Sequence, residues 1–103
     1  MKTKENVSLS GLHPVMRLVM GVCDDIYKNH SHELVITEAL GGLHSPTSWH
    51  PCGRAIDIRT RNIKTSDEKY EVFVEIKRKL GIGFNVVLHN THIHIAFNLS
   101  GVR

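Results

Sequence analysis

The sequence predicts a small α+β domain, in which an antiparallel sheet carries two helices on one face and leaves its other face open. Two stretches, residues 14–28 and 65–80, repeat apolar residues at helical spacing. Residues 54–59 and 92–97 alternate apolar and polar side chains, as half-buried strands do. Each alternating strand would turn its isoleucines toward the helices and its polar side chains toward the open face.

The first helix is expected to begin near Pro14, a residue that suits the first turn of a helix, and to continue to about Lys28. Residues 1–9 before it are expected to be loose. The buried stripe of this helix should consist of the apolar residues at helical spacing, Val15, Leu18, Val19, Val22 and Ile26.

The second helix should begin after Thr65, which suits the N-cap position, with Glu68 three residues later as its capping-box partner. Gly81 should end it. Its buried residues should be Val72, Phe73, Ile76 and Leu80.

Two further strands complete the sheet. Residues 34–37 are rich in β-branched side chains, which favours a strand. Residues 84–88 and 92–97 surround a short turn at 89–91 and should form a hairpin. Residues 39–52 are expected to form a long loop.

The composition limits the classes of function. A chain of 103 residues with 41% hydrophobic content is long enough for one domain, residues 1–103, with a modest core. Its net charge is +3 without the Lys/Arg clusters of a nucleic-acid groove, so nucleic acid is not an expected partner. No apolar run reaches the length of a membrane span, so no membrane partner is expected either. The oligomeric state does not follow from the sequence.

The amino terminus leads into no apolar segment of the signal-peptide type, so the chain is expected to be cytoplasmic as synthesised. A phage-derived lysin that is released at lysis through a separate pore fits the same observation. The two cysteines, Cys23 and Cys52, are expected to be free thiols.

Two histidines and one aspartate form the most informative pattern in the chain. The alternation places Asp57 on the open face of one strand and His94 on the open face of another. His50 precedes Asp57 across a turn marked by Pro51 and Gly53, which can fold it back over the strand. Catalytic zinc accepts two histidines and one carboxylate and keeps its fourth position for water.

The pattern Ser-x-His-x-x-Gly-x-Ala-x-Asp, at residues 48–57, followed by His92-Ile93-His94, resembles the zinc-site signature of the D-alanyl-D-alanine carboxypeptidase family. That family includes the phage L-alanyl-D-glutamate endolysins and shares its fold with the amino-terminal signalling domain of hedgehog proteins. The motif order, from residue 34 to residue 97, is most similar to the hedgehog-type branch. The resemblance implies one zinc ion, bound by His50, Asp57 and His94, with His44 and His92 as unliganded histidines that line the site.

The chain departs from this family where the catalytic glutamate usually stands. The positions shortly before the last zinc ligand are Leu88, His89, Asn90 and Thr91, and none of them is acidic. His92 shares a strand face with His94 and is therefore expected to serve as the general base, a role for which histidine is the commonest choice. The acidic cluster that binds calcium in animal hedgehog domains has no counterpart after Glu38, so calcium is not expected.

The remaining polar residues each have a simpler interpretation. His13, His30 and His32 are expected to be solvated and idle, and His89 to be exposed in its turn. Ser48 and Arg54 are candidate substrate contacts, although a loop-bracing serine and a solvent-exposed arginine explain them equally well. Trp49 suits packing or a wall of the cleft, and Cys52 would compete for zinc only if Asp57 did not complete the ligand set.

These observations predict a zinc peptidase that hydrolyses peptidoglycan stem peptides by a metal-activated water. Its catalytic residues would be His92 and His44, its substrate contacts Ser48 and Arg54, and its partner the cell-wall peptide. The alternative is a hedgehog-like zinc-binding module that has lost its general base and its catalysis. A zinc-stabilised structural fragment of a larger assembly is a third interpretation, which the free fourth position disfavours.

Overall fold

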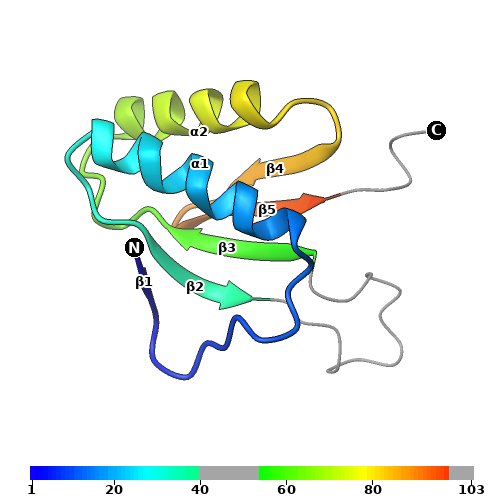
Figure 1. Cartoon of the computed structure of the whole chain (residues 1–103). Helices are drawn as coiled ribbons and strands as arrows, with labels where there is room; N and C mark the ends of the chain where they lie inside the picture. The colour runs from blue at the N-terminus through cyan, green and yellow to red at the C-terminus, as the bar shows by residue number, and fades with distance from the viewer. Residues whose placement is uncertain (40–53, 98–103) are drawn as a thin grey trace.

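The computed structural model describes residues 1–39 and 54–97, which form a small α+β fold, as the sequence predicts (Figure 1). The elements follow in the order β1 (Lys2–Thr3), α1 (Val15–Asn29), β2 (Val35–Ala39), β3 (Ala55–Arg59), α2 (Ser66–Leu80), β4 (Phe84–Leu88) and β5 (His92–Phe97). The boundaries of β4 and β5 agree with the predicted hairpin, and most of the predicted 39–52 loop lies outside the described residues.

The five strands form one sheet in the order β1-β2-β3-β5-β4, so β3 is its middle strand. The pairs β2/β3, β3/β5 and β5/β4 are antiparallel. The pair β1/β2 is parallel, so the predicted antiparallel sheet is mixed at its two-residue edge strand. The expectation that residues 1–9 are loose is wrong at Lys2–Thr3, because the backbone amides of Lys2 and Lys4 donate hydrogen bonds of 2.8 Å to the carbonyls of Leu34 and Ile36.

Both helices lie on the same face of the sheet (Figure 1). The inward-facing isoleucines of β3 and β5 are fully buried beneath them, which confirms the predicted alternation. These are Ile56, Ile58, Ile93 and Ile95. Their neighbours in the chain point to the opposite face of the sheet, where the polar side chains collect. The buried thiol of Cys23 belongs to this core, and desolvation, with the nearby charge of Asp24, raises its pKa to about 12.

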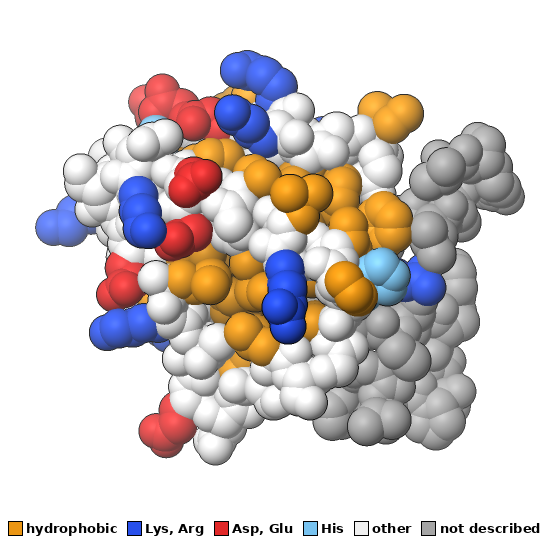
Figure 2. Space-filling model, viewed as in Figure 1, with side chains coloured by type: hydrophobic (Ala, Val, Ile, Leu, Met, Phe, Trp, Pro, Cys, Tyr) orange, Lys and Arg blue, Asp and Glu red, His pale blue; other side chains and the backbone are white. Residues whose placement is uncertain are grey.

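The buried face of α1 differs from the predicted one. Leu18 is expected in the core but is 62% exposed. Hydrophobic side chains reach the surface on the face of the molecule seen in Figure 2. The residues that α1 buries are Met16, Val19, Met20, Cys23, Ile26 and Tyr27. The first half of α1 is apolar on most sides, so two overlapping stripes of apolar residues fit helical spacing. Packing against the sheet buries the stripe that contains Met16 and Met20 and leaves Leu18 exposed.

The second helix begins and ends as predicted, but the carboxylate of Glu68 contacts His30 and His32 instead of completing the predicted capping box. The hydroxyl oxygen of Thr65 accepts a hydrogen bond of 3.1 Å from the backbone amide of Glu68, as an N-cap residue should. Gly81 follows the helix with a φ of 83°, a backbone conformation that favours glycine. Val72 and Ile76 are fully buried, whereas Phe73 and Leu80 pack at the edge of the core. Neither α1 nor α2 is long and apolar enough to cross a membrane.

Candidate metal and catalytic site

Asp57 and His94 lie side by side on the open face of the sheet. The antiparallel register of β3 and β5 pairs Asp57 with His94 and Arg59 with His92. Because the isoleucines between them point toward the helices, all four of these polar side chains project from the same face. The sequence prediction that the two strands bring Asp57 and His94 together is therefore confirmed.

The carboxylate of Asp57 lies within hydrogen-bond or ion-pair distance of both histidines. Nδ1 of His94 lies 2.8 Å from Oδ1 of Asp57, and Nε2 of His92 lies 3.8 Å from Oδ2 of the same carboxylate. All three side chains are half-buried, between 20% and 32% exposed. They are thus partly shielded from water and still reachable by a ligand.

The chemistry of these donors fits zinc. A tetrahedral zinc ion with bonds of about 2.0–2.2 Å places its donor atoms about 3.4 Å apart, so the observed 2.8 Å between Asp57 and His94 needs only a small adjustment. Two of the three predicted ligands are therefore adjacent. The third, His50, lies outside the described residues, as do His44, Ser48, Trp49 and Cys52.

The pairing of β2 with β3 brings a second acidic residue opposite Asp57. An irregularity in the pairing of β2 with β3, between Ile36 and Glu38, sets Glu38 opposite Asp57. Directly paired residues of neighbouring strands share a face, and two like charges in such a pair destabilise a sheet. Glu38 is exposed, and its distance in the chain from His94 gives no sign that the two residues lie on neighbouring parts of one sheet face.

His92 is oriented by its neighbours in the hairpin. Its Nδ1 lies 3.2 Å from the hydroxyl of Thr91, and its ring stacks on that of His89 at 4.6 Å between centroids. If Nδ1 carries the proton and donates a hydrogen bond to the hydroxyl of Thr91, Nε2 is unprotonated. Its lone pair then faces Asp57 and the open side of the sheet. His89 is exposed, as predicted, and it also touches the edge of the site through this stacking.

Arg54 lies just before β3 and is half-buried. Its carbonyl accepts a hydrogen bond of 2.8 Å from the amide of Phe97, which fixes its backbone against the end of β5. Its Nε is buried, and no hydrogen-bond partner for it occurs in the described part of the chain. This position is compatible with the predicted substrate contact, which stays a prediction.

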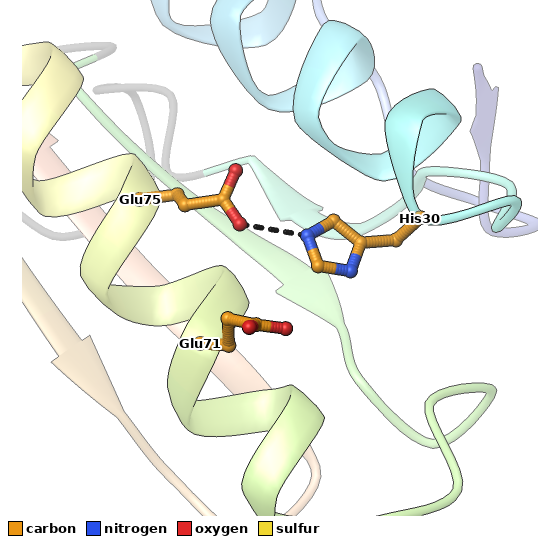
Figure 3. Close-up of side chains that lie close together, drawn as sticks. All are labelled: His30, Glu71 and Glu75. Atoms are coloured by element: carbon orange, nitrogen blue, oxygen red, sulfur yellow. Dashed lines mark hydrogen bonds and ion pairs between the residues drawn. The ribbon is translucent and has the colours of Figure 1, made fainter.

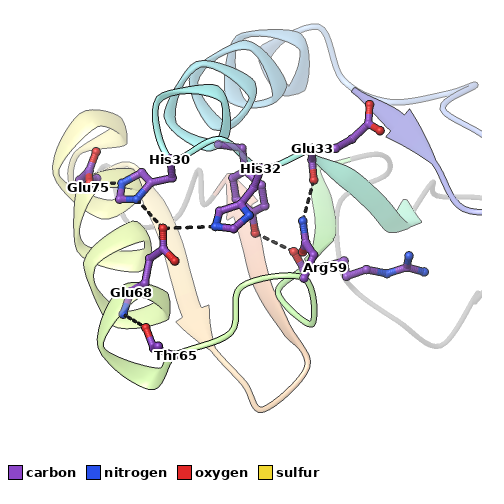
Figure 4. Close-up of polar contacts among 9 residues, drawn as sticks. His30, His32, Glu33, Arg59, Thr65, Glu68 and Glu75 are labelled. Carbon is purple, nitrogen blue, oxygen red and sulfur yellow. Dashed lines mark hydrogen bonds and ion pairs between the residues drawn. The ribbon is translucent and has the colours of Figure 1, made fainter.

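A second polar cluster joins the end of α1 to α2, and it corrects the expectation that His30 and His32 are idle (Figure 4). Nδ1 of His30 lies 3.0 Å from Oε2 of Glu68, and its Nε2 lies 2.7 Å from Oε2 of Glu75. Nε2 of His32 lies 3.2 Å from the same oxygen of Glu68. The hydrogen bond with Glu75, supported by Glu68, raises the pKa of His30 because it stabilises the imidazolium.

The same cluster could hold a metal ion. His30, Glu71 and Glu75 each place one ligand atom within 4.8 Å of the other two (Figure 3). No other group of three histidine, cysteine, aspartate or glutamate side chains among residues 1–39 and 54–97 meets that spacing. The repeat of glutamates at 68, 71 and 75 on one side of α2 is visible in the sequence, but their partner His30 lies just after another helix, α1.

Comparisons of the chain with protein-family models, with curated proteins and with solved structures give no match.

Proposed function

We propose that this protein is a zinc-dependent peptidase that hydrolyses the stem peptides of peptidoglycan. The observation that carries the proposal is the pair of Asp57 and His94 on the open face of the sheet, with His92 beside them. Two adjacent donors of the type that zinc prefers, next to an unliganded imidazole, suit a hydrolytic centre better than a structural one. The peptidoglycan substrate rests on the resemblance of residues 48–57 and 92–94 to the carboxypeptidase family.

Each residue of the proposed site would have a separate role in hydrolysis. Asp57 and His94, joined by His50, would hold the zinc ion, which when bound makes water more acidic and polarises a carbonyl. His92 would accept the proton of the attacking water at Nε2, while Thr91 holds the opposite ring nitrogen. His44 would donate a hydrogen bond to the oxygen on which negative charge develops. Ser48 and Arg54 would position the substrate.

The alternative is a hedgehog-like module that binds zinc without catalysis. The observation that favours it is the sequence from Leu88 to Thr91, which lacks the usual acid. Glu38 weakens this alternative, because its pairing with Asp57 brings a carboxylate to the same face by another route.

One experiment separates the two functions. The zinc-loaded protein is incubated with purified peptidoglycan, and the released fragments are analysed by mass spectrometry. A peptidase releases fragments that share one cleaved bond, and an Asp57→Ala variant releases none. A protein that retains zinc and leaves every stem peptide intact is a binding module.

A further inference from the structure

A polar hollow of about 320 Å³ lies beside His92 on the open side of the sheet. It is lined by three cationic side chains, two hydroxyls and one imidazole, those of Lys4, Arg59, Arg61, Thr37, Thr91 and His92. These side chains come from the segment after β1, from β2, from the end of β3 with its following turn, and from the hairpin. Residues far apart in the sequence therefore gather positive charge around one space.

Within residues 1–39 and 54–97, the three cationic side chains of this hollow have no acidic partner. None of the lining side chains is acidic. In the part of the chain that the structure describes, neither Lys4 nor Arg59 nor Arg61 forms an ion pair. The Nε of Arg59 is buried there without a hydrogen-bond partner. A buried donor without an acceptor is costly, so a ligand that supplies oxygen atoms would be favoured at this position.

The hollow has a fixed position relative to the candidate metal ligands. Arg59 pairs with His92 across β3 and β5, whereas Asp57 pairs with His94 two residues along each strand. A two-residue step in a strand covers about 7 Å, so the hollow is displaced by that length from the Asp57–His94 pair. Neither Asp57 nor His94 lines the hollow, but His92 borders both places. An extended peptide spans this step with two residues.

We infer that the hollow binds a carboxylate of the peptide substrate that lies about two residues from the scissile bond. The inference rests on the proposed function, and it narrows the substrate to a peptide with a negative charge at that distance. The guanidinium groups of Arg59 and Arg61 match the two oxygens of a carboxylate, and Lys4 adds a third positive charge. The hydroxyl of Thr91 accepts from Nδ1 of His92 and keeps its own hydrogen to donate to the same group, whereas the hydroxyl of Thr37 already donates to the carbonyl of Asp57 at 3.4 Å.

The test measures binding and cleavage with the same peptides. A cell-wall tetrapeptide with all its carboxyls free is compared with versions in which each carboxyl is amidated in turn, by calorimetric titration of the zinc-loaded protein. We expect amidation of one particular carboxyl to weaken binding about tenfold or more, because a charge-assisted hydrogen bond is lost. This difference should shrink as salt is added, since the charges are partly exposed.

Variants assign the effect to the hollow. The double change Arg59→Gln and Arg61→Gln should abolish the difference between the free and the amidated peptide. Arg61→Gln alone, at an exposed position, should reduce it without a risk to folding. The double change Lys64→Gln and Arg78→Gln also removes two exposed charges, but from outside the hollow, and should leave the difference intact.

The outcomes separate this inference from the proposed function. Tighter binding of the free carboxylate that depends on Arg59 and Arg61 supports the inference. If the same protein cleaves no peptide bond, only the proposed peptidase activity is contradicted. Cleavage that is equally fast for the free and amidated peptides overturns the inference and leaves the peptidase standing. Binding of inorganic phosphate in the hollow, without any preference among the peptides, also overturns it.

Discussion

The hydroxyl of Tyr27 in α1 donates a hydrogen bond of 2.6 Å to the carbonyl oxygen of Arg59 at the end of β3. Tyr27 is fully buried, and its burial raises the pKa of its hydroxyl. This bond ties the helix layer to the strand that carries Asp57. Tyr27→Phe should lower the free energy of unfolding by about 1 kcal/mol, because the carbonyl of Arg59 loses its donor. Chemical denaturation measures this change.

A matched control tests the same chemical change elsewhere. Tyr70 is 60% exposed on α2, so Tyr70→Phe should change the free energy of unfolding by no more than about 0.5 kcal/mol. Equal effects of the two substitutions would contradict a special role for the Tyr27 hydrogen bond.

Asp57→Ala should remove one equivalent of bound zinc, because it deletes a charged ligand from the open face and leaves His94 without its partner. Elemental analysis of dialysed protein measures the metal content. Asp25→Ala, at an exposed position of α1, is the control and should retain the wild-type content. If Asp57→Ala keeps full zinc, the ligand assignment is wrong.

His92→Ala should keep its zinc and lose peptide cleavage by about 10²–10⁴-fold, the usual effect of removing a general base. The initial rate of cleavage of a cell-wall peptide is the measurement. His89→Ala removes the neighbouring exposed ring and should have a much smaller effect. Near-normal activity of His92→Ala would contradict its role as general base and would point to Glu38. In that case Glu38→Gln should lower the rate of cleavage by the same large factor.

Chelation of zinc should lower the melting temperature of the protein without unfolding it at room temperature. The metal would join β3 to β5, so its binding energy is coupled to folding. Among its described buried residues the helix-covered core contains no histidine, aspartate or glutamate, and its one thiol, Cys23, is not part of the site, so the core should persist when the metal leaves. A melting temperature that is unchanged after verified removal of zinc would contradict this coupling.

The cluster of His30, His32, Glu68, Glu71 and Glu75 should make stability depend on pH. Because the pKa of His30 is raised, its contribution to the free energy of unfolding is complete below the ordinary histidine pKa of 6.5. That contribution is lost as the pH rises through the raised pKa. The pKa of Glu68 is lowered, first by its hydrogen bond with His32 and then by that with His30. Its contribution is complete above the ordinary value of 4.5 and is lost as the pH falls through the lowered one.

The difference in melting temperature between the wild type and His30→Gln should therefore be largest between pH 4.5 and 6.5. Thermal melts across that range and on both sides of it measure this difference. His13→Gln is the control, since His13 lies at the other end of α1 and contacts none of these glutamates. A difference that does not vary with pH would show that the cluster acts by packing alone.

The sequence predicts the parts of this fold that depend on local patterns. Alternation identifies β3 and β5, and it also places Asp57 and His94 on one face, because side-chain direction in a strand has a period of two residues. The strand β1 has only two residues and no pattern of its own, since its partner lies more than thirty positions away in the chain. Its parallel pairing with β2 therefore follows from tertiary contacts alone.

The parts of the site that could not be predicted depend on how separate elements meet. His30 follows α1, and its partners Glu68 and Glu75 lie on α2, so the cluster exists only because the two helices pack together. Glu38 comes opposite Asp57 through an irregularity in strand pairing, which the side-chain pattern of β2 does not indicate.

The central position of β3 constrains how this chain can change in length during evolution. A single-residue insertion or deletion within β3 would turn every later side chain of the strand to the other face, moving a carboxylate such as that of Asp57 beneath the helices and isoleucines into water. Both neighbouring strands would lose their partners in the same event. Length variation among descendants of this protein should therefore fall in connections such as residues 61–65 and 81–83, while β3 changes only by substitution.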